Sequence, residues 1–501
     1  MRKQIGLLFL IKIFRIPLNL VLLTLTARYF GVSLEKDIWL YTFTTMIVID
    51  SALWGPINET FRTKFVFLKE QNSSLDAIAL TQSLLTYFII FSLLLIGLIT
   101  TFPDVFAHLI APNYNSAKLA IVSDMLLYVA PVLIFNQLMQ IGIGILNAYE
   151  IFFIAEISGF VSTIINIGIL YFLAEKIGIL ALPFSYYIST GLLIIFIIIF
   201  ILKNKIPLFT KNWNFRFNGF KMFFIFALPF FLPYFFGQVN SMVEKILASG
   251  ISNGTISILD FSNRIPLLMY GIVINIITTI LVPVLSKYYI RGDKSKFNEE
   301  FSKVFQLGLL VIGFIVAFVA GSSIPIVHFL YDKGTIAQSD LVKISEMSIL
   351  YSFSLIGIFL YVIFGMSLLS SEKQKYYAFM GMLTQITVTL LNFILVKYLG
   401  IYTFPLSILS CHFIFGIFMF LKYPYRKGLK LDIKYFIIIT LLLLIAYLGI
   451  SKIQTSNFHL TIIIQIIMLC VIFLVLSVVF RLEEKKLVII FIKNKFSKLK
   501  Q

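Results

Sequence analysis

Apolar stretches of about twenty residues follow one another along almost the whole chain, separated by short polar segments. A helix needs roughly 20 mostly apolar residues to cross the hydrocarbon of a bilayer. The 501-residue chain is 59% hydrophobic and only 13% charged, and its mean hydropathy is +0.98. A water-soluble protein of this length has too much surface to hide so much apolar side chain. The sequence therefore predicts an all-α polytopic membrane protein.

About fourteen transmembrane helices can be counted. Their predicted spans are 5–30, 37–60, 76–102, 118–147, 151–174, 178–202, 220–249, 256–285, 302–330, 340–369, 377–397, 401–421, 434–451 and 459–480. The start of the chain imitates a signal peptide, but Lys12 and Arg15 interrupt its apolar stretch and no small-residue cleavage site follows. We expect it to be a retained first helix. Pro229 and Pro233 are expected to bend the seventh helix.

Lysines and arginines gather in alternate loops, as the positive-inside rule requires of cytoplasmic segments. The cation-rich segments are 2–3, 62–69, 203–221, 287–303, 373–375, 422–434 and 481–500. The loops between them carry single lysines, namely Lys36, Lys118, Lys176, Lys333, Lys397 and Lys452. An even number of helices with both termini in the cytoplasm explains this alternation. The net charge of +18 is accounted for by these loops, so no nucleic-acid partner is expected.

An eight-residue motif occurs twice. GILALPFS at 178–185 recurs 222 residues later as GIYTFPLS at 400–407, and Asn166 upstream of the first copy matches Asn392 upstream of the second. Both copies fall in the fifth and sixth helices of a six-helix unit. Two such units would have the same orientation and be related by an axis along the membrane normal. Chance similarity between apolar segments is the alternative.

The repeat predicts four parts. Two pseudo-symmetric six-helix lobes would cover 1–215 and 216–430, and two extra transmembrane helices would follow at 431–480. The tail at 481–501 alternates apolar residues with lysine clusters. It is predicted to be a basic amphipathic segment on the anionic cytoplasmic leaflet, with a simple solvated tail as the alternative.

Enzyme motifs are missing from the sequence. There is no nucleotide-binding loop, nucleophile elbow or catalytic pair of carboxylates, and the four histidines have no metal-binding spacing. Cys411 and Cys470 both lie in apolar runs, so no disulfide or thiolate metal site is expected. The sequence predicts a protein that is not an enzyme, binds no metal or cofactor, and takes its energy from an ion gradient or the membrane potential.

Five segments stand out from the apolar background. They are ARYFGVSLEKDIWLYTF (27–43), LWGPINETF (53–61), HLIAPNY (108–114), the run 131–147 ending in GILN, and FSNRIPLLMYGIVINIITTILVPVLSKYY (261–289). They resemble segments of the MurJ/MviN lipid II flippases, a family of the multidrug/oligosaccharidyl-lipid/polysaccharide exporter superfamily. The similarity extends over about 1–425, and the family also has fourteen helices.

The resemblance implies a flippase of the bacterial inner membrane. Its substrate would be a polyprenyl-pyrophosphate-linked saccharide such as lipid II, moved from the cytoplasmic to the outer leaflet by alternating access. Two alternatives are a flippase for exopolysaccharide or O-antigen repeat units and a multidrug or cation antiporter of the same superfamily. A polytopic glycosyltransferase, ligase or polymerase is a further alternative, but it needs a large catalytic loop that the short outer loops do not provide.

Cations inside predicted helices are the candidate substrate-binding groups, because ionisable side chains are costly in a bilayer. Lys12 and Arg15 lie one helical turn apart in the first helix, and Arg264 lies in the eighth. The resemblance aligns Arg15 and Arg264 with cavity arginines of the family, where they would hold the pyrophosphate. The alternatives are snorkelling of Lys12 and Arg15 towards headgroups and a structural ion pair of Arg264 with Asp260.

Acidic residues on the second helix are the candidate gating or coupling groups. Asp37 matches an acidic position of the family and is expected near the outer surface, with Arg28 as a possible contact. Asp50 and Glu59 lie deeper, and Asp50 stands where the family has an arginine pair. We expect Asp50 to pair with the cations of the first helix. Asp260 completes this group as the partner of Arg264.

Overall fold

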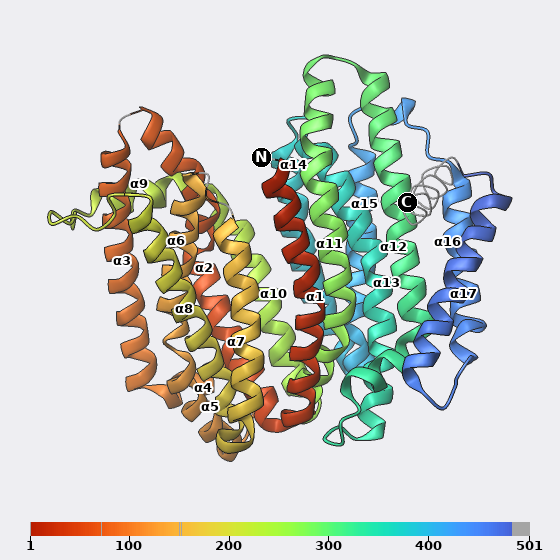
Figure 1. Cartoon of the computed structure of the whole chain (residues 1–501), viewed down its shortest axis with the longest axis horizontal. Coiled ribbons are helices and arrows are strands. Elements are labelled where there is room, and N and C mark those ends of the chain that lie inside the picture. The colour runs from red at the N-terminus through yellow and green to blue at the C-terminus, as the bar shows by residue number, and fades with distance from the viewer. Residues whose placement is uncertain (1, 72, 150, 152, 483–501) are drawn as a thin grey trace, which may run out of the picture. The chain divides into compact units, whose positions relative to one another are not determined.

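The computed structural model describes residues 2–71, 73–149, 151 and 153–482, and this described part of the chain contains helices and no strands (Figure 1). This confirms the predicted fold class. Each predicted span coincides with one long helix or with two helices in succession. By length and hydropathy, nine stretches of the described residues qualify as membrane spans, some of them containing two helices. The count of fourteen crossings stays a prediction.

The chain divides into two compact units. Unit 1 comprises Met1–Ile258, Lys333–Ala337 and Gln385–Ile401, and unit 2 comprises Leu259–Asp332, Gln338–Thr384 and Tyr402–Gln501. Unit 1 contains α1 (Arg2–Phe30), α2 (Leu34–Gln71), α3 (Ser74–Thr101), α4 (Pro103–Ile110), α5 (Ser116–Val129), α6 (Val132–Ala148), α7 (Phe153–Ile177), α8 (Ala181–Lys203), α9 (Asn218–Ala227) and α10 (Phe231–Ser249). The division by contacts thus assigns α9 and α10 to unit 1, whereas the two pseudo-symmetric lobes stay a prediction.

Unit 2 is built from the later helices. They are α11 (Thr255–Ile290), α12 (Lys294–Tyr331), α13 (Gln338–Leu369), α14 (Gln374–Leu399), α15 (Thr403–Leu421), α16 (Ile433–Leu448) and α17 (Phe458–Val479), with the first residues of α11 and the second half of α14 belonging to unit 1. The last two helices pack on α12 through a small apolar cluster that includes Ala317, Leu442 and Leu469. Figure 1 shows them side by side in blue.

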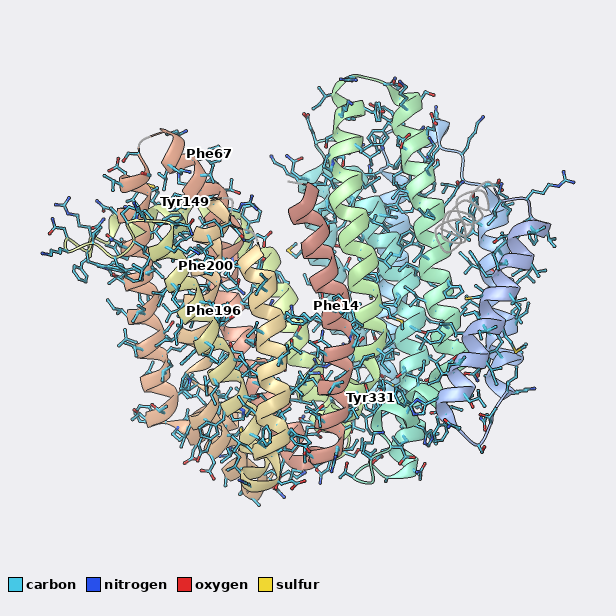
Figure 2. All side chains as sticks on the ribbon, viewed as in Figure 1. Phe14, Phe67, Tyr149, Phe196, Phe200 and Tyr331 are labelled. Carbon is cyan, nitrogen blue, oxygen red and sulfur yellow. The ribbon has the colours of Figure 1, made fainter. Side chains whose placement is uncertain are left out.

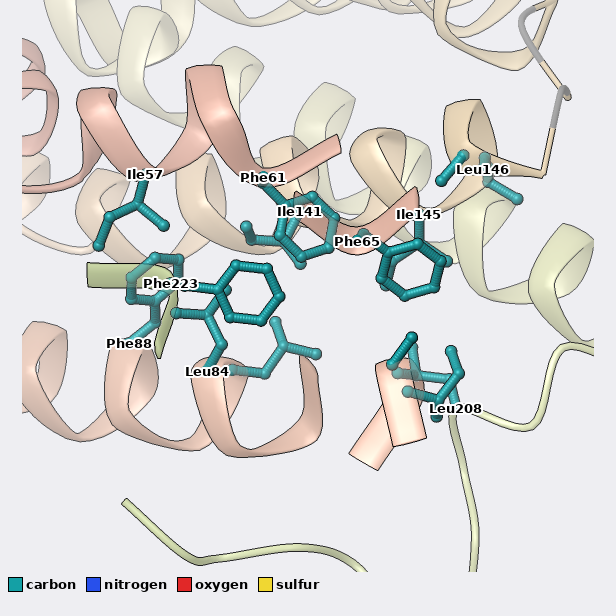
Figure 3. Packing of buried hydrophobic residues seen from close by; sticks show 14 of the residues in the cluster. Ile57, Phe61, Phe65, Leu84, Phe88, Ile141, Ile145, Leu146, Leu208 and Phe223 are labelled. Atoms are coloured by element: carbon teal, nitrogen blue, oxygen red, sulfur yellow. The ribbon is translucent and has the colours of Figure 1, made fainter. Parts of the chain in front are cut away.

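Aromatic side chains form much of the core of unit 1. Phe61 and Phe65 of α2 pack with Phe223 of α9 and Ile141 of α6, and the rings of Phe61 and Phe223 lie 5.3 Å apart (Figure 3). Phe61, Phe65 and Phe223 are at most 1% exposed. Lipid offers no hydrophobic driving force between helices, so such close packing contacts hold the bundle together. The same contacts keep α2 in place, and α2 carries most of the candidate acidic residues.

The two copies of the repeated motif fold in the same way. In each, a long helix ends at a glycine with a positive φ angle, 57° at Gly178 and 53° at Gly400. A short 3-10 turn follows, η1 (Gly178–Leu180) or η3 (Gly400–Tyr402), and the next helix then carries a proline at its third residue. Glycine is needed because other residues are strained at positive φ. The local repeat predicted from the sequence is therefore confirmed.

The seventh predicted helix is broken, as its prolines suggested. α9 ends at Ala227, the 3-10 turn η2 (Leu228–Phe230) follows, and α10 begins at Phe231. Pro229 lies within the turn. A proline removes one backbone hydrogen bond and clashes with the preceding turn, which explains the interruption. Pro17 in the middle of α1, by contrast, is accommodated in one continuous helix.

Candidate functional site

Arg15 of α1 lies against the backbone of α7. Its Nη1 atom is 2.7 Å from the place where a Cβ atom on Gly159 would stand, so only glycine lets the guanidinium approach this closely. Its Nε atom is buried and has no hydrogen-bond partner among the described residues. Arg15 thus keeps unused hydrogen-bonding capacity inside the bundle. The side chain of Lys12 lies outside the described part of the chain.

Asp37 is buried at the first turn of α2, where it is 1% exposed. Its Oδ2 accepts from the backbone N–H of Gly254 at 2.6 Å, and its Oδ1 accepts from the N–H and the hydroxyl of Ser257 at 2.7 and 2.6 Å. These donors belong to the first turn of α11 and the residue before it. An anion at a helix N-terminus is stabilised by the free N–H groups and by the helix dipole.

Arg28 occupies a different environment from the one predicted. It is exposed near the end of α1, and its guanidinium carbon lies 5.6 Å from the ring centroid of Tyr29. The contacts that the structure gives Asp37 are with α11 and its preceding residue rather than with Arg28. The fixed backbone donors at α11 therefore replace the ion pair suggested by the sequence.

Asp50 is also buried on α2, with 1% of its surface exposed. Its Oδ1 accepts from Nε2 of Gln137 at 2.6 Å, and its Oδ2 accepts from Nδ2 of Asn136. Both donors are neutral amides on α6. The sequence suggested that Asp50 pairs with the cations of the first helix. In the structure, Arg15 lies against α7 and the described donors to Asp50 are amides. A carboxylate without a paired cation is an unusual and costly group in a membrane bundle.

Glu59 is exposed, one helical turn beyond a close contact between α2 and α10. Its Oε2 accepts from the hydroxyl of Tyr234 at 3.1 Å. The Tyr234 ring lies so close to Gly55 that a Cβ atom there would stand 2.7 Å from it. Glu59 and Gly55 thus hold the same tyrosine, just beyond the break between α9 and α10. A change in the bend between α9 and α10 would therefore move the hydrogen-bond partner of Glu59.

Arg264 and Asp260 form an ion pair one turn apart on α11, in unit 2. Nε of Arg264 lies 3.0 Å from Oδ1 of Asp260, and the arginine side chain is 48% exposed. Tyr331 of α12 (Figure 2) anchors this part of α11, since its hydroxyl donates to the carbonyl of Phe261 at 3.1 Å. A half-exposed guanidinium on a membrane-spanning helix is costly in lipid and tolerable in water. Its exposed face therefore indicates a hydrated surface.

Two groups of polar residues were missed by the sequence analysis. One is the Asn136–Gln137 pair that holds Asp50. The other links α10 to α14 within unit 1, where Asn240 donates to Oε1 of Gln385 at 3.1 Å and accepts from the hydroxyl of Thr389 at 3.1 Å. Adjacent amides inside an apolar run, as in IFNQLMQ at 134–140, were the sequence feature that could have indicated the first of these groups. An unpaired amide in an apolar environment costs less than an unpaired charge but still needs hydrogen-bond partners.

Two of the described arginines are the groups that could bind an anion. Arg15 belongs to unit 1 and Arg264 to unit 2. Guanidinium groups bind phosphate oxygens through paired hydrogen bonds. Within the described residues, no cluster of three or more histidine, cysteine or acidic side chains is arranged to hold a metal ion.

Comparison with solved structures identifies the fold. The chain superposes on a structure described as "Lipid II flippase MurJ, inward closed conformation" with a TM-score of 0.82 and 23% identity, covering 96% of this chain and 99% of that one. It also superposes on an inward-facing multidrug resistance MATE transporter of the MOP superfamily, with a TM-score of 0.69, 12% identity, and coverage of 85% and 94%.

Comparison with known sequences leads to the same family. A protein of Buchnera aphidicola (subsp. Schizaphis graminum) named as a probable lipid II flippase MurJ is 26% identical, over 69% of this chain and 67% of its own. One of the same name from Borreliella burgdorferi is 23% identical, over 83% of this chain and 82% of its own. The profile of the family described as "Lipid II flippase MurJ" matches residues 26–480. The chain therefore belongs to the MurJ family of lipid II flippases.

Proposed function

We propose that this protein moves lipid II, or a close polyprenyl-pyrophosphate-linked relative, from the cytoplasmic to the outer leaflet of the bacterial inner membrane. The observation that carries the proposal is the match of the family profile to residues 26–480. Intramembrane arginines in both units are consistent with it, because the diphosphate of such a lipid needs cationic partners. The protein acts as a transporter that breaks no covalent bond of its substrate.

Arg15 and Arg264 are the proposed diphosphate ligands. Arg15 has a buried nitrogen without a hydrogen-bond partner among the described residues, and Arg264 presents an exposed face despite its bond to Asp260. A diphosphate offers several acceptor oxygens, so it can accept paired hydrogen bonds from a guanidinium group. Lys12 is proposed as an additional cation near Arg15.

The proposed topology places both termini in the cytoplasm. Cysteines introduced at Asn204, Asp293 and Lys427 should react with a membrane-impermeant reagent only from the cytoplasmic side, and those at Asn113 and Gly334 only from outside. A residue labelled from the opposite side would overturn the proposed crossings. The tail at 481–501, which lies outside the described residues, is proposed to bind anionic headgroups.

Depletion of the protein tests the substrate. Lipid extracts analysed by mass spectrometry should show accumulation of lipid II, and the accumulated lipid should stay in the cytoplasmic leaflet. Accumulation of a different lipid-linked saccharide would identify another substrate. No accumulation of any lipid-linked saccharide would contradict a flippase.

Substitutions test the two arginines. Arg15→Ala or Arg264→Ala should abolish complementation of a depleted strain while leaving membrane insertion intact. Arg→Lys at either position should restore it only in part, because lysine keeps the charge and loses the paired hydrogen bonds. Arg291→Ala, in an exposed turn after α11, is the matched control and should complement fully. Full complementation by both alanine variants would rule out the proposed diphosphate site.

A further inference from the structure

The surroundings of Asp50 contain more polar groups than its two hydrogen bonds use. Gln137 donates to Asp50 through Nε2, but its Oε1 is buried and has no hydrogen-bond partner among the described residues. The hydroxyl of Ser92 on α3 is in the same condition. Both side chains are 2% exposed. Buried polar atoms are almost always hydrogen-bonded, so two such atoms near one carboxylate call for an explanation.

Ser92 and Gln137 line the same narrow void between α3 and α6. The rest of its lining is apolar, including Leu85, Phe88 and Leu138, and it has no room for a water molecule. A bound water therefore does not satisfy the two atoms. A hydrated ion does not fit there either. The ligand that needs no volume is a proton.

A rotation of the Gln137 amide would satisfy every one of these atoms once Asp50 is protonated. Turning the amide by half a turn exchanges its oxygen and its NH2 group. Oε1 would then accept the new O–H of the Asp50 carboxyl. The NH2 group would turn towards the void, where the hydroxyl of Ser92 can accept from it. Asn136 can continue to donate to the second carboxyl oxygen.

In the ionised state the carboxylate itself is hydrogen-bonded, while Oε1 of Gln137 and the hydroxyl of Ser92 stay without partners among the described residues. With the amide in its present orientation, both carboxylate oxygens accept an N–H, one from Asn136 and one from Gln137. The protonated state takes up one proton from the solvent, and neither state needs a counter-ion to be hydrogen-bonded. The carboxyl group thus has a hydrogen-bonded arrangement in both states, and the two states differ by one proton and one amide rotation. The geometry points to a reversible proton-binding site, and we propose that Asp50, Gln137 and Ser92 form it.

The described hydrogen-bond partners of Asp50 are neutral groups. Tyr186 of α8 is near enough to be affected by the charge of Asp50, but a phenol is neutral at physiological pH. The hydrogen bonds of Asp50 in the described structure come from the two amides, and α6 carries no charged residue. The other helices packed on α2 also carry charged side chains, namely Asp76, Lys118, Asp124, Lys221, Glu244 and Lys245. The groups that act on Asp50 are the amides of Gln137 and Asn136.

A proton site inside unit 1 would allow transport to be coupled to a proton gradient. Protonation removes a buried charge from α2, the helix whose Glu59 end contacts α10. A charged and a neutral Asp50 should therefore favour different packings of α2. This coupling to transport rests on the proposed function, whereas the proton site itself does not.

Infrared difference spectroscopy of the full-length protein in lipid nanodiscs tests the site directly. Spectra recorded at acid and alkaline pH should contain the carbonyl band of a protonated carboxyl in apolar surroundings, shifted in D2O. Asp50→Asn should remove that band. A band that remains unchanged in Asp50→Asn would overturn the proposal. So would a band that responds to added Na⁺ at constant pH but not to pH.

Ser92→Ala provides a second test if Asp50→Asn does not fold. The hydroxyl is used only in the protonated state, so its loss should make protonation harder and move the pH midpoint of the band down by about half to one unit. Thr100→Ala is the matched control on α3, because its hydroxyl bonds to its own helix, and it should leave the midpoint in place. An unmoved midpoint in Ser92→Ala would contradict the amide rotation.

Reconstituted vesicles separate the proton site from the proposed function. Movement of lipid II across vesicles containing the wild-type protein should respond to an imposed pH gradient, and the response should be lost in Asp50→Asn. A response that survives in Asp50→Asn would exclude proton coupling through this residue. If lipid II does not move under any condition while the infrared band still titrates, the proposed substrate is wrong and the proton site stands.

Discussion

Two carboxylates on the same helix are held in opposite ways. Asp37 and Asp50 both lie on α2 and are each 1% exposed. Asp37 accepts from two backbone N–H groups and a hydroxyl around the start of α11, and backbone donors cannot turn into acceptors. Asp50 accepts from two side-chain amides, which can. The first arrangement offers the carboxylate fixed backbone donors, and the second offers it amides that can either donate or accept.

The largest effect is expected from Asp37→Asn. The substitution removes the charge and turns an NH2 group towards donors that have no other acceptor. Hydrogen bonds to a charged group and the loss of one partner in a buried site suggest a destabilisation of about 3 kcal/mol. Thermal unfolding of the protein in detergent measures it. An unfolding temperature equal to that of the wild type would show that the Asp37 charge is dispensable.

Gly254→Ala should weaken the same arrangement from the donor side. Gly254 has a φ of 85°, and an added Cβ atom would collide with Cγ1 of Val32. Backbone strain of this kind costs about 1–2 kcal/mol, and the N–H that donates to Asp37 would shift. We expect a loss of about 2 kcal/mol in the same unfolding assay. Gly237→Ala is the control, because it lies in open space on α10; an equal loss there would remove the special role of Gly254.

Asp50→Asn should change stability much less than Asp37→Asn. Replacing an uncompensated carboxylate by a neutral amide removes the cost of burying a charge, which offsets the weakened hydrogen bonds. We expect a change within about 1 kcal/mol together with loss of transport. Purification and unfolding of both variants side by side measures the contrast. Equal destabilisation by the two substitutions would contradict the proposed difference between Asp37 and Asp50.

Asp432 gives the reference for an exposed carboxylate. It caps the N-terminus of α16, where hydrogen bonds from the side chain and backbone of Lys434 lower its pKa. Because the folded pKa lies below the unfolded one, its contribution is present near neutral pH and is lost as the pH falls below about 4. Asp432→Ala should cost about 0.5 kcal/mol at pH 7 and nothing in acid. A larger loss that persists in acid would mean that the cap does not act through its charge.

The sequence by itself determined the elements of the fold. The apolar spans, the interruption of the seventh helix by its prolines, and the repeat of glycine and proline at 178–185 and 400–407 were predicted and are present. These features depend on a few neighbouring residues and on the length of apolar chain that a bilayer requires. They are local, so no knowledge of packing is needed to find them.

Only the tertiary structure decided the partners of the charged residues. The donors to Asp37 lie 217 and 220 residues away, and the amide donors to Asp50 lie 86 and 87 residues away. Charge alone favoured pairing with the arginines of the first helix. Which helix faces which is set by small residues such as Gly55 and Gly159 at close contacts, and a side chain can reach only what that packing brings near. The choice between an ion pair, a helix terminus and a pair of amides therefore depends on three-dimensional neighbours that a linear pattern does not record.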